Sequence, residues 1–359
     1  MADARAVHDA TLDVAEIEVV APNLKRRLSG VTSTIVQLVP VQARSLRIAT
    51  IGPGLPGSLP HLKWWQVPGL LRLPRSGRPR IWHARRNVEM IAGIALRYVL
   101  RAPLKLVFTS AAQRDHRPFT KWLIRRMDAV IATSARSGSF LEVPHRVVMH
   151  GVDVATFHPA EAESDRFSAS RLPGRHAVGC FGRIRHQKGT DLFVEAMLDL
   201  LPRYPDWTAV ITGRVTAEHR PFAEALRRRI EAAGLSERIR FLGEVPDIPA
   251  WYRRVALYVA PSRNEGFGLT PLEAMASATA VVASDAGAYA ELVVQGETGA
   301  VVPAGDGAAL RAAIEPYLQD PELARAHGEN GLAVARARFP LEKEAAGVRA
   351  VYDALWDEG

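Results

Sequence analysis

Two carboxylates eight positions apart mark the stretch of this chain that is best suited to chemistry. Glu265 and Glu273 enclose two glycines, Gly266 and Gly268, in the segment PSRNEGFGLTPLE of residues 261–273. Glycines let a backbone come close to a bound molecule, and carboxylate oxygens accept hydrogen bonds from hydroxyl groups. A ligand with both phosphates and hydroxyls, such as a nucleotide sugar, would use both features. A solvated glutamate in an ordinary strand–loop–helix turn would also fit the local pattern.

The flanking segments predict a strand before this loop and a helix after it. The apolar run 256–260 reads as a short buried strand, and residues 269–278 read as a helix with Thr270 as N-cap and Pro271 in the first position. A helix start directs free backbone N–H groups and the positive end of the helix dipole outward. We therefore expect an anion, most often a phosphate, beside the two carboxylates.

A second stretch, FGRIRHQKGTDLF in residues 181–193, offers positive charge. It places Arg183 and Lys188, flanked by Gly182 and Gly189, between an expected strand and an expected helix. Such loops lie at the carboxyl ends of parallel strands, where α/β proteins bind ligands. A guanidinium and an ammonium group there can hold a diphosphate and neutralise its charge as it leaves. Two solvated cations on a surface loop are the alternative.

Together the two stretches resemble the motifs of retaining GT-B glycosyltransferases of the large family 4. The first carries the E-x7-E signature with G-F-G-L-x-x-L-E, and the second carries G-R-x-x-x-x-K-G with matching spacing. The resemblance implies catalytic roles for Arg183, Lys188 and Glu265. It also implies donor-binding roles for residues of both stretches and of the ITGR segment, namely Gly182, Gly213, Glu265, Gly266, Phe267, Gly268, Leu269 and Glu273.

A closer resemblance is to lipopolysaccharide core mannosyltransferases. It rests on the strings FTSAAQR, HGVD, RIRHQKGTD and APSRNEGFGLTPLEAMAS. It implies transfer of a hexose, namely mannose from GDP-mannose, to an inner-core sugar on a lipid anchor. No cofactor is implied, and metal independence is expected because Arg and Lys can neutralise the diphosphate and the sequence has no D-x-D cluster suited to a divalent cation. A UDP-sugar donor, or another glycan or glycolipid acceptor, is the alternative.

Residues near the ends of expected strands and loops in the first half are candidates for holding the acceptor. They are Gly30, His83, Arg85, Arg114, His116 and His150. In one respect the sequence departs from the family, because many members have a histidine near the end of the strand that here reads VFTSA. His83 or His116 could substitute, or either could be an ordinary surface histidine, so no acceptor base is assigned.

The length and the order of elements predict two domains. With 359 residues, 48% of them hydrophobic, the chain can bury a sizeable core. Strands that alternate with helices predict an α/β fold of the GT-B type, with two doubly wound Rossmann-like domains facing a cleft. We expect an acceptor-binding domain over residues 1–159, a linker over 160–175 and a nucleotide-sugar-binding domain over 176–339. The C-terminal helix, 340–359, is expected to cross back onto the first domain.

Positive charge is concentrated in the first part of the chain. Residues 1–150 contain 23 Lys and Arg against 9 Asp and Glu, although the whole chain carries only +8. Such an excess predicts polyanionic partners, here a phosphorylated or lipid-linked glycan and the inner membrane surface. Residues 53–80, with Trp64 and Trp65 among Leu and Arg, suit a membrane surface and equally a packed loop. A basic lipid- or nucleic-acid-binding protein is the alternative class, but no nucleic-acid recognition motif accompanies the charge, so nucleic acid is not expected.

The remaining sequence features predict a cytoplasmic protein. The single cysteine, Cys180, lies in an apolar run and has no partner for an internal disulfide, which suits a reducing compartment. The N-terminus has no signal-peptide pattern, and no apolar run approaches the ~20 residues that a transmembrane helix needs. Contact with the inner face of the cytoplasmic membrane is expected to be peripheral.

Overall fold

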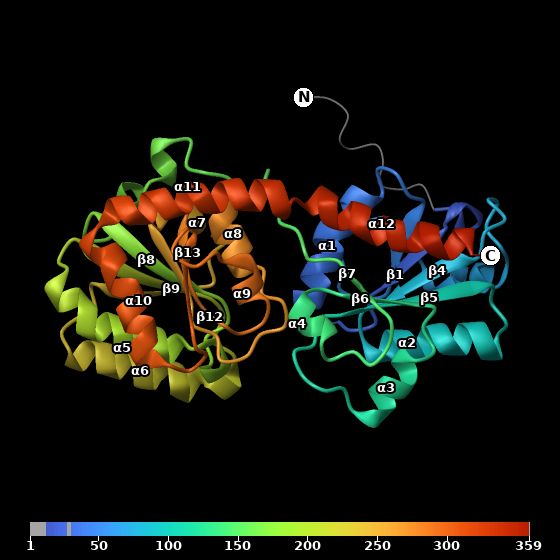
Figure 1. The fold of residues 1–359 in the computed structure, drawn as a ribbon, viewed down its shortest axis with the longest axis horizontal. Helices are drawn as coiled ribbons and strands as arrows, with labels where there is room; N and C mark the ends of the chain where they lie inside the picture. The colour runs from blue at the N-terminus through green and yellow to red at the C-terminus, as the bar shows by residue number, and fades with distance from the viewer. Residues whose placement is uncertain (1–11, 27–29, 359) are drawn as a thin grey trace. The chain divides into compact units, whose positions relative to one another are not determined.

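The computed structural model describes residues 12–26 and 30–358, and the chain forms two compact units. The first unit comprises Met1–His150 and Leu341–Gly359, and the second comprises Gly151–Pro340. Each unit is a parallel sheet with helices packed against it, as Figure 1 shows. The predicted pair of Rossmann-like α/β domains is therefore confirmed. Within the described residues, no helix has the length and apolar character needed to cross a membrane.

In the described part of the first unit, seven parallel strands follow the order β3-β2-β1-β4-β5-β6-β7. The strands are β1 (Val19–Pro22), β2 (Ile48–Ile51), β3 (His61–Leu62), β4 (Arg80–Ala84), β5 (Leu104–Ser110), β6 (Ala129–Ala132) and β7 (Arg146–Val147). The α-helices are α1 (Gly30–Gln42), α2 (Asn87–Ile94), α3 (Pro118–Ile124), α4 (Ala135–Gly138) and α12 (Leu341–Asp357). The 3₁₀-helices η1 (Val14–Glu16) and η2 (Trp64–Leu71) and the π-helix η3 (Ala95–Val99) also belong to this unit.

The C-terminal helix α12 completes the core of the first unit, as predicted. Its apolar side, with Val348, Tyr352 and Leu355, packs in one buried cluster with Ile35 and Leu38 of α1. The same cluster includes residues of the central strands, so α12 covers part of one face of the sheet. The two ends of the chain are thus joined in one hydrophobic core.

In the described part of the second unit, six parallel strands follow the order β10-β9-β8-β11-β12-β13. The strands are β8 (His176–Phe181), β9 (Trp207–Thr212), β10 (Ile239–Gly243), β11 (Leu257–Ala260), β12 (Ala280–Ser284) and β13 (Gly299–Val302). The helices are α5 (Thr190–Leu200), α6 (Arg220–Ala232), α7 (Ile248–Arg254), α8 (Thr270–Ala276), α9 (Tyr289–Leu292), α10 (Gly307–Gln319) and α11 (Pro321–Arg338).

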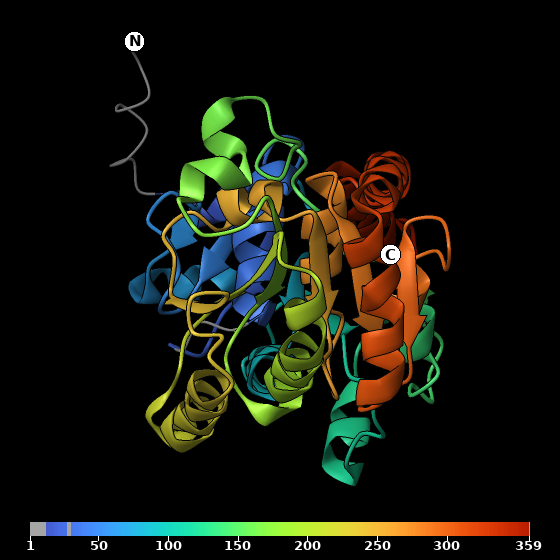
Figure 2. The ribbon, with the colours of Figure 1, turned by 90° about the vertical axis from the view of Figure 1, so that its left-hand side faces the viewer.

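Alternation along the strands of the second unit sends side chains to both faces of its sheet. Val178, Cys180, Leu257 and Val259 pack with α5, α6 and α10 in one core. The intervening Tyr258 points to the other face, where its ring meets Tyr252 of α7. Figures 1 and 2 show helices on both sides of this sheet. Because both faces are covered, the strands are nearly continuous apolar runs.

Residues 160–175, which the sequence suggested as a linker, lie within the second unit. Phe167 is buried, and Asp165 Oδ1 accepts a hydrogen bond of 2.8 Å from Arg253 Nε on α7. The first unit also ends earlier than residue 159, because the Val152 amide donates to the Phe339 carbonyl at the far end of the second unit. One aromatic residue and one ion pair within a polar segment are enough to attach it, and composition alone does not reveal them.

Candidate functional site

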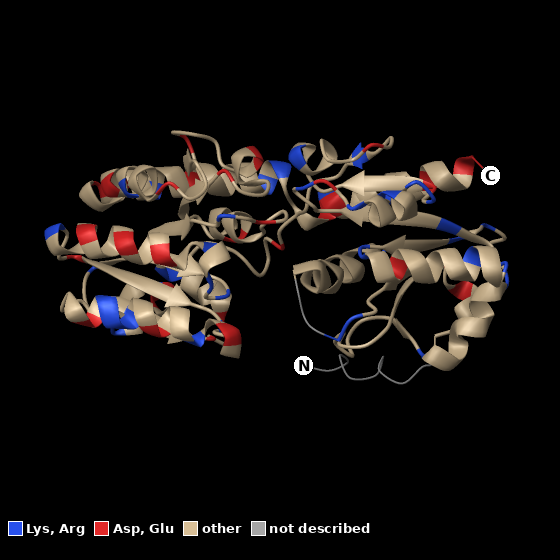
Figure 3. Cartoon of the chain, turned by 90° about the horizontal axis from the view of Figure 1, so that it is seen from below, with Lys and Arg blue, Asp and Glu red and all other residues tan. Residues whose placement is uncertain are grey.

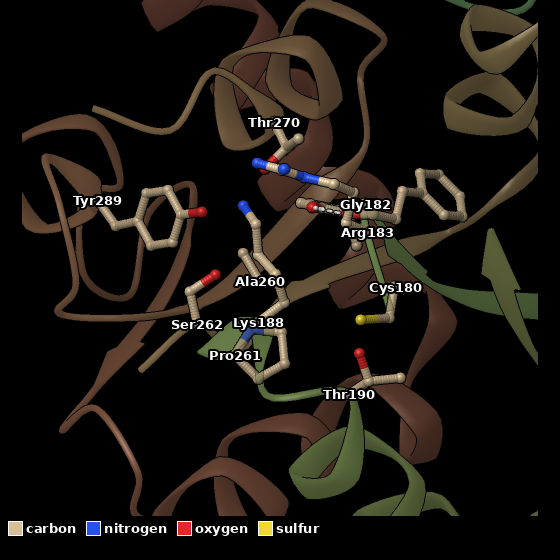
Figure 4. A pocket seen from close by; sticks show the side chains of 12 residues that line it. Cys180, Gly182, Arg183, Lys188, Thr190, Ala260, Pro261, Ser262, Thr270 and Tyr289 are labelled. Atoms are coloured by element: carbon tan, nitrogen blue, oxygen red, sulfur yellow. Dashed lines mark hydrogen bonds between the residues drawn. The ribbon is translucent and has the colours of Figure 1, made fainter. Parts of the chain in front are cut away.

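A pocket lies at the carboxyl ends of β8 and β11 in the second unit. Figure 4 shows side chains that converge on it from both flanking loops and from the helices beyond them. Its lining residues are Cys180, Phe181, Gly182, Arg183, Lys188, Thr190, Tyr258, Ala260, Pro261, Ser262, Thr270 and Tyr289. Residues from both motif stretches of the sequence therefore line the same pocket, as expected for loops that follow neighbouring parallel strands.

Glycines allow the loops around the pocket to touch. Gly189 has φ +70°, and a Cβ there would lie 1.9 Å from the carbonyl oxygen of Pro261. Gly213, which follows β9, has φ +137°, and its Cβ would lie 1.8 Å from the carbonyl oxygen of Gly182. No side chain fits such distances without a backbone shift, and the positive φ angles also favour glycine. Gly213 thus supports Gly182, which itself lines the pocket.

Two ion pairs join the loop after β8 and the first turn of α5 to the loop after β11. Lys188 Nζ pairs with Glu265 Oε2, and each side chain is only 19% exposed. Beside them, Arg263 forms a two-pronged pair with Asp191, with both N–O distances at 2.7 Å. Planar two-pronged pairs fix geometry as well as charge. Lys188 and Glu265 are thus held together before any ligand is bound.

The second carboxylate of the motif, Glu273, lies in the first turn of α8. Its Oε2 accepts a hydrogen bond of 2.8 Å from the Tyr252 hydroxyl. Burial raises the pKa of Glu273, although the Tyr252 hydrogen bond and the charge of Lys188 act in the opposite direction. The helix begins at Thr270 with Leu269 in the N-cap position, so the predicted Thr270 N-cap is wrong by one residue. The reason is that Gly268, with φ +84°, makes the bend before Leu269.

Three tyrosines around the pocket were not found by sequence reasoning. Tyr252 and Tyr258 pack edge to face with ring centroids 5.3 Å apart, and the Tyr289 hydroxyl lies 3.5 Å from Glu265 Oε2. Burial raises the pKa of all three, so they act as neutral hydrogen-bond donors. Only Tyr258 could have been expected from the sequence. It lies within an apolar strand, and alternation along the strand places its side chain on the opposite face from Leu257 and Val259. Tyr252 and Tyr289 come from helices that carry no motif.

The glycine loop is anchored from the inside by Phe267. This side chain is 4% exposed, and its carbonyl accepts a hydrogen bond of 3.1 Å from the Ala288 amide. The ring of Phe267 thus holds the loop in place, and the donor-binding role of this residue stays a prediction. Gly266 and Leu269 lie half-buried in the same loop, and the Gly266 amide donates to Glu265 Oε1 at 3.2 Å.

Among the acceptor candidates in the first unit, His83 is enclosed by the fold. It is the second-last residue of β4, is 1% exposed, and contacts the Tyr352 hydroxyl through Nδ1 at 2.5 Å and Thr109 Oγ1 through Nε2 at 2.6 Å. Burial lowers the pKa of His83 well below its usual range, and Arg85 adds to this shift. A neutral ring with both nitrogens engaged links β4 to β5 and α12, so it does not face a ligand.

His150 is also an internal link. Its Nδ1 lies 2.7 Å from Glu344 Oε1 of α12, and both residues are buried. This contact places His150 inside the first unit rather than in a surface site. Arg85 is half-buried and close to the His83 carbonyl, with Nη1 at 3.4 Å.

The other acceptor candidates lie nearer the surface. His116 Nε2 lies 3.3 Å from Ser110 Oγ, and burial lowers the pKa of His116 together with Arg114 and Lys121. Arg114 is exposed. Gly30 is exposed at the start of α1, next to residues 27–29, which lie outside the described part of the chain.

A buried ion pair at the end of β4 escaped the sequence analysis. Arg86 Nη1 contacts Glu89 Oε1 at 2.8 Å and Asn23 Oδ1 at 2.7 Å, and Arg86 Nη2 donates to Thr32 Oγ1 at 2.9 Å. Glu89 is fully buried and also accepts from the Arg85 amide at 2.8 Å. Because the partners satisfy each other, the network fixes the loops after β1 and β4. Asn23 and Thr32 carried no motif that would have pointed to it.

Comparison with solved structures shows which fold the chain adopts. The structure of Anabaena Alr3699/HepE in complex with UDP and glucose superposes over 94% of this chain and all of that chain, with a TM-score of 0.78 at 19% identity. At this identity the likeness shows the fold, which is that of GT-B glycosyltransferases. The C-terminal domain of a glycosyl transferase group 1 family protein (LpcC) from Francisella tularensis is 38% identical, with a TM-score of 0.51, over 53% of this chain and 99% of that chain.

Sequence comparison gives the family. Residues 162–334 match the model for glycosyl transferases group 1. The lipopolysaccharide core biosynthesis mannosyltransferase LpcC of Rhizobium leguminosarum bv. viciae is 69% identical over 344 residues, which cover 96% of this chain and 98% of that protein. The corresponding enzyme LpsB of Rhizobium meliloti (strain 1021) is 52% identical, over 96% and 99%. The chain therefore belongs to the family of these lipopolysaccharide core biosynthesis mannosyltransferases, and the group 1 match lies in its second unit.

Proposed function

We propose that this glycosyltransferase moves mannose from GDP-mannose to a sugar of the lipopolysaccharide inner core, with retention of the anomeric configuration. The sugar and the acceptor are supported by the names of two relatives that align over nearly the whole chain at 69% and 52% identity. The retaining reaction is supported by the resemblance of residues 265–273 to the E-x7-E signature. The observation that carries the proposal is the pocket that brings Arg183 and Lys188 next to the Glu265 loop.

In the proposed reaction, the cations stabilise the leaving group. The acceptor hydroxyl attacks the anomeric carbon, the bond from that carbon to the diphosphate oxygen breaks, and the acceptor proton passes to the leaving phosphate. Arg183 and Lys188 hold the diphosphate and offset the negative charge that develops on it. Since these side chains supply positive charge, we propose that no metal ion is needed.

The two carboxylates position hydroxyl groups of the donor. Lys188 is paired with Glu265 in the free protein, so an incoming diphosphate would draw Lys188 toward itself and release Glu265 for the sugar hydroxyls. Tyr252 donates to Oε2 of Glu273, which leaves Oε1 to accept from the ribose. The buried carboxylate thus gains a second hydrogen bond when the donor binds.

A donor panel tests the function directly. Purified protein is incubated with GDP-mannose, UDP-glucose and other nucleotide sugars, with and without EDTA, and the released nucleotide is identified. We expect GDP release from GDP-mannose, inhibition by GDP more than by UDP, and no loss in EDTA. Release of UDP alone would assign the donor to the UDP class, and a requirement for added metal would contradict metal independence.

Substitution of the ion pair tests the site. Lys188→Ala and Glu265→Gln each remove a charge-assisted contact from the transition state, and we expect turnover to fall ~100-fold or more. Arg229→Ala is the matched control, because it breaks the exposed Arg229–Glu195 pair in the same unit. Normal GDP release by Lys188→Ala, with an unchanged melting temperature, would remove Lys188 from the mechanism.

A further inference from the structure

The second unit contains a cavity at the end of its sheet where β8 and β11 begin, with a volume of about 550 Å³. His176 and Ala177 start β8, and Ala256 directly precedes β11. The pocket described above lies at the other ends of these strands, at Phe181 and Ala260. His176 and Phe181 are ~17 Å apart in an extended strand of this length. This cavity, which we call the amino-end cavity, is therefore separate from the pocket that the two motifs line.

The walls of the amino-end cavity are fixed by buried contacts. They come from η4 (Glu163–Asp165), η5 (Phe167–Ser170), the end of α7 and the start of α11. Arg253 Nε of α7 donates to Asp165 Oδ1 at 2.8 Å, and these side chains are only 10% and 14% exposed. The ring of Phe167 is also buried. The cavity is thus formed before any ligand binds, and its volume is typical of small-molecule sites.

Positive charge is concentrated in the amino-end cavity. Among the described residues, its lining includes five arginines and two acids, namely Arg166, Arg175, Arg253, Arg254 and Arg325 with Glu163 and Glu322. The second unit as a whole contains 21 Lys and Arg against 24 Asp and Glu, and Figure 3 shows both signs interspersed along its ribbon. Guanidinium groups match the geometry of phosphate and carboxylate groups. The lining therefore favours an anion, although the unit as a whole carries net negative charge.

Two of the five arginines have no acidic partner. Acids pair with the other three, in the pairs Arg166–Glu163, Arg253–Asp165 and Arg325–Glu322. Arg175 and Arg254 form no ion pair with any acid in the described part of the chain. Arg254 Nη2 donates to the Ser164 carbonyl at 2.9 Å, whereas its buried Nε has no acceptor among the described residues. The cavity thus holds two positive charges that the fold itself does not match.

The two unmatched arginines enter the same edge of the sheet. Each stands two residues before one end of a backbone hydrogen bond, in which the Ala256 amide donates to the Ala177 carbonyl at 2.9 Å. Because neighbouring strands lie only ~4.8 Å apart, the backbones that carry Arg175 and Arg254 enter the sheet side by side. A single anion in the cavity can therefore contact both guanidinium groups.

We propose that the amino-end cavity is a second ligand site, which binds a small molecule through a phosphate monoester. Such a group carries a charge of about −1.5 to −2 at neutral pH, which matches Arg175 and Arg254 together, whereas a carboxylate matches only one of them. Apolar lining residues, among them Val255 and Ala256, offer a surface for the body of the ligand. The proposal concerns a different end of the sheet from the proposed reaction and holds whether or not that reaction is correct.

Titration calorimetry with the full chain tests the proposal. The probes are inorganic phosphate, glycerol 3-phosphate, glucose 6-phosphate and AMP, each at up to millimolar concentration. We expect at least one of the three esters to bind more tightly than inorganic phosphate, because its body also contacts the cavity. Arg175→Gln should bind that ester about tenfold more weakly, and Arg175→Gln/Arg254→Gln about 100-fold more weakly, since each substitution removes one charge-assisted contact.

Arg227→Gln/Arg228→Gln is the matched control, because it removes two arginines from exposed positions of α6 in the same unit. This control should bind the ester like the wild type, and so should Lys188→Ala, which alters only the other pocket. Without an ester, Arg175→Gln and the control should melt and release nucleotide like the wild type.

Three results would overturn the proposal. Loss of ester binding in Lys188→Ala, but not in the Arg175/Arg254 variant, would place the ester in the motif-lined pocket. An equal loss in the Arg227/Arg228 control would reduce the binding to unspecific charge attraction. Binding of inorganic phosphate alone, or of no probe at all, would show that the cavity is not a site for phosphate esters.

Discussion

Two opposing effects act on the carboxyl group of Glu273: burial disfavours its charged form, whereas the Tyr252 hydrogen bond and the charge of Lys188 favour it. Burial raises the pKa of Glu273, so the folded protein favours the protonated form more than the unfolded chain does. The cost of keeping the carboxylate buried is present above the folded-state pKa and disappears as the pH falls below the unfolded value of 4.5. We propose that the donor's ribose is the ligand that uses this carboxylate, since groups with perturbed pKa values gather at functional sites.

Glu273→Gln should therefore stabilise the free protein and inactivate it. At pH 8 we expect a higher melting temperature than for the wild type, with a difference that shrinks as the pH approaches 4.5. Turnover should fall ~100-fold, since the amide is a poorer acceptor for a hydroxyl group. Thermal melts at several pH values and nucleotide release check both. The exposed Glu297→Gln serves as control and should change neither quantity. A lower melting temperature for Glu273→Gln at pH 8 would contradict this account.

At the residue scale, the sequence indicates groups that act through a local motif and misses those whose partners are distant. Lys188 and Glu265 were recognisable from spacing, and the structure brings them together. His150 looked like a site residue, but its partner Glu344 lies 194 positions away. His83 likewise contacts Tyr352, 269 positions away. No periodicity or spacing could reveal such pairs, because they form only when α12 packs on the first unit.

At the element scale, the pocket depends on loops that touch backbone to backbone. Helix and strand order followed from apolar runs that alternate with amphipathic segments, so the two parallel sheets could be predicted. The attachment of residues 160–175 to α7 could not, because one buried Phe167 in a polar segment leaves no periodic signal. Loop contacts of this kind depend on tertiary packing. In the sequence, only the glycines at the contact points indicated them.

Gly189→Ala tests the contact between the loop of Gly189 and Pro261. Gly234→Ala is the matched control, because its backbone angle is nearly the same and its surroundings are open. The φ angles are +70° and +67°, but a Cβ meets Pro261 at the first position and nothing within 4 Å at the second. Gly234→Ala should cost about 1 kcal/mol from the left-handed backbone alone. Gly189→Ala should cost roughly 3 kcal/mol or more, since strain and a backbone clash add together. Urea unfolding measures both.

Donor binding separates the two glycine variants further. Gly189→Ala should weaken binding of the nucleotide sugar, because the loop with Lys188 must move away from Pro261, whereas Gly234→Ala should bind normally. Titration calorimetry provides this measurement. Equal stability and equal binding in the two variants would show that the loops do not need their close contact.

At the scale of the whole molecule, the first unit is built from both ends of the chain. Eight residues of α12 are buried, among them Tyr352 and Trp356, and His83 and His150 rely on this helix for partners. Six of the eight are large apolar side chains, and burial of each contributes ~1.5–3 kcal/mol, so the loss of α12 removes a stabilisation as large as the ~5–15 kcal/mol that holds a typical domain folded. The second unit is one continuous segment, Gly151–Pro340, so its core does not depend on α12.

A chain that ends at Pro340 should therefore retain only one cooperative unit. We expect the residues 1–340 fragment to bind the dye ANS and to lose part of the unfolding transition of the full chain. The residues 151–340 fragment should melt cooperatively on its own. Circular dichroism melts of both fragments check this. A cooperative transition for residues 1–150 within the shortened chain would show that α12 is dispensable.

The same connectivity sets an order of events on the ribosome. Domains usually fold from the N-terminus onward as they are synthesised. Here the apolar side of α1 packs on the sheet but lacks the part of its cover that α12 supplies until that helix has been made, although the second unit is complete before α12. The unit whose translation begins first is thus the one whose core is completed later, and its apolar surface stays partly open while the second unit is already able to fold.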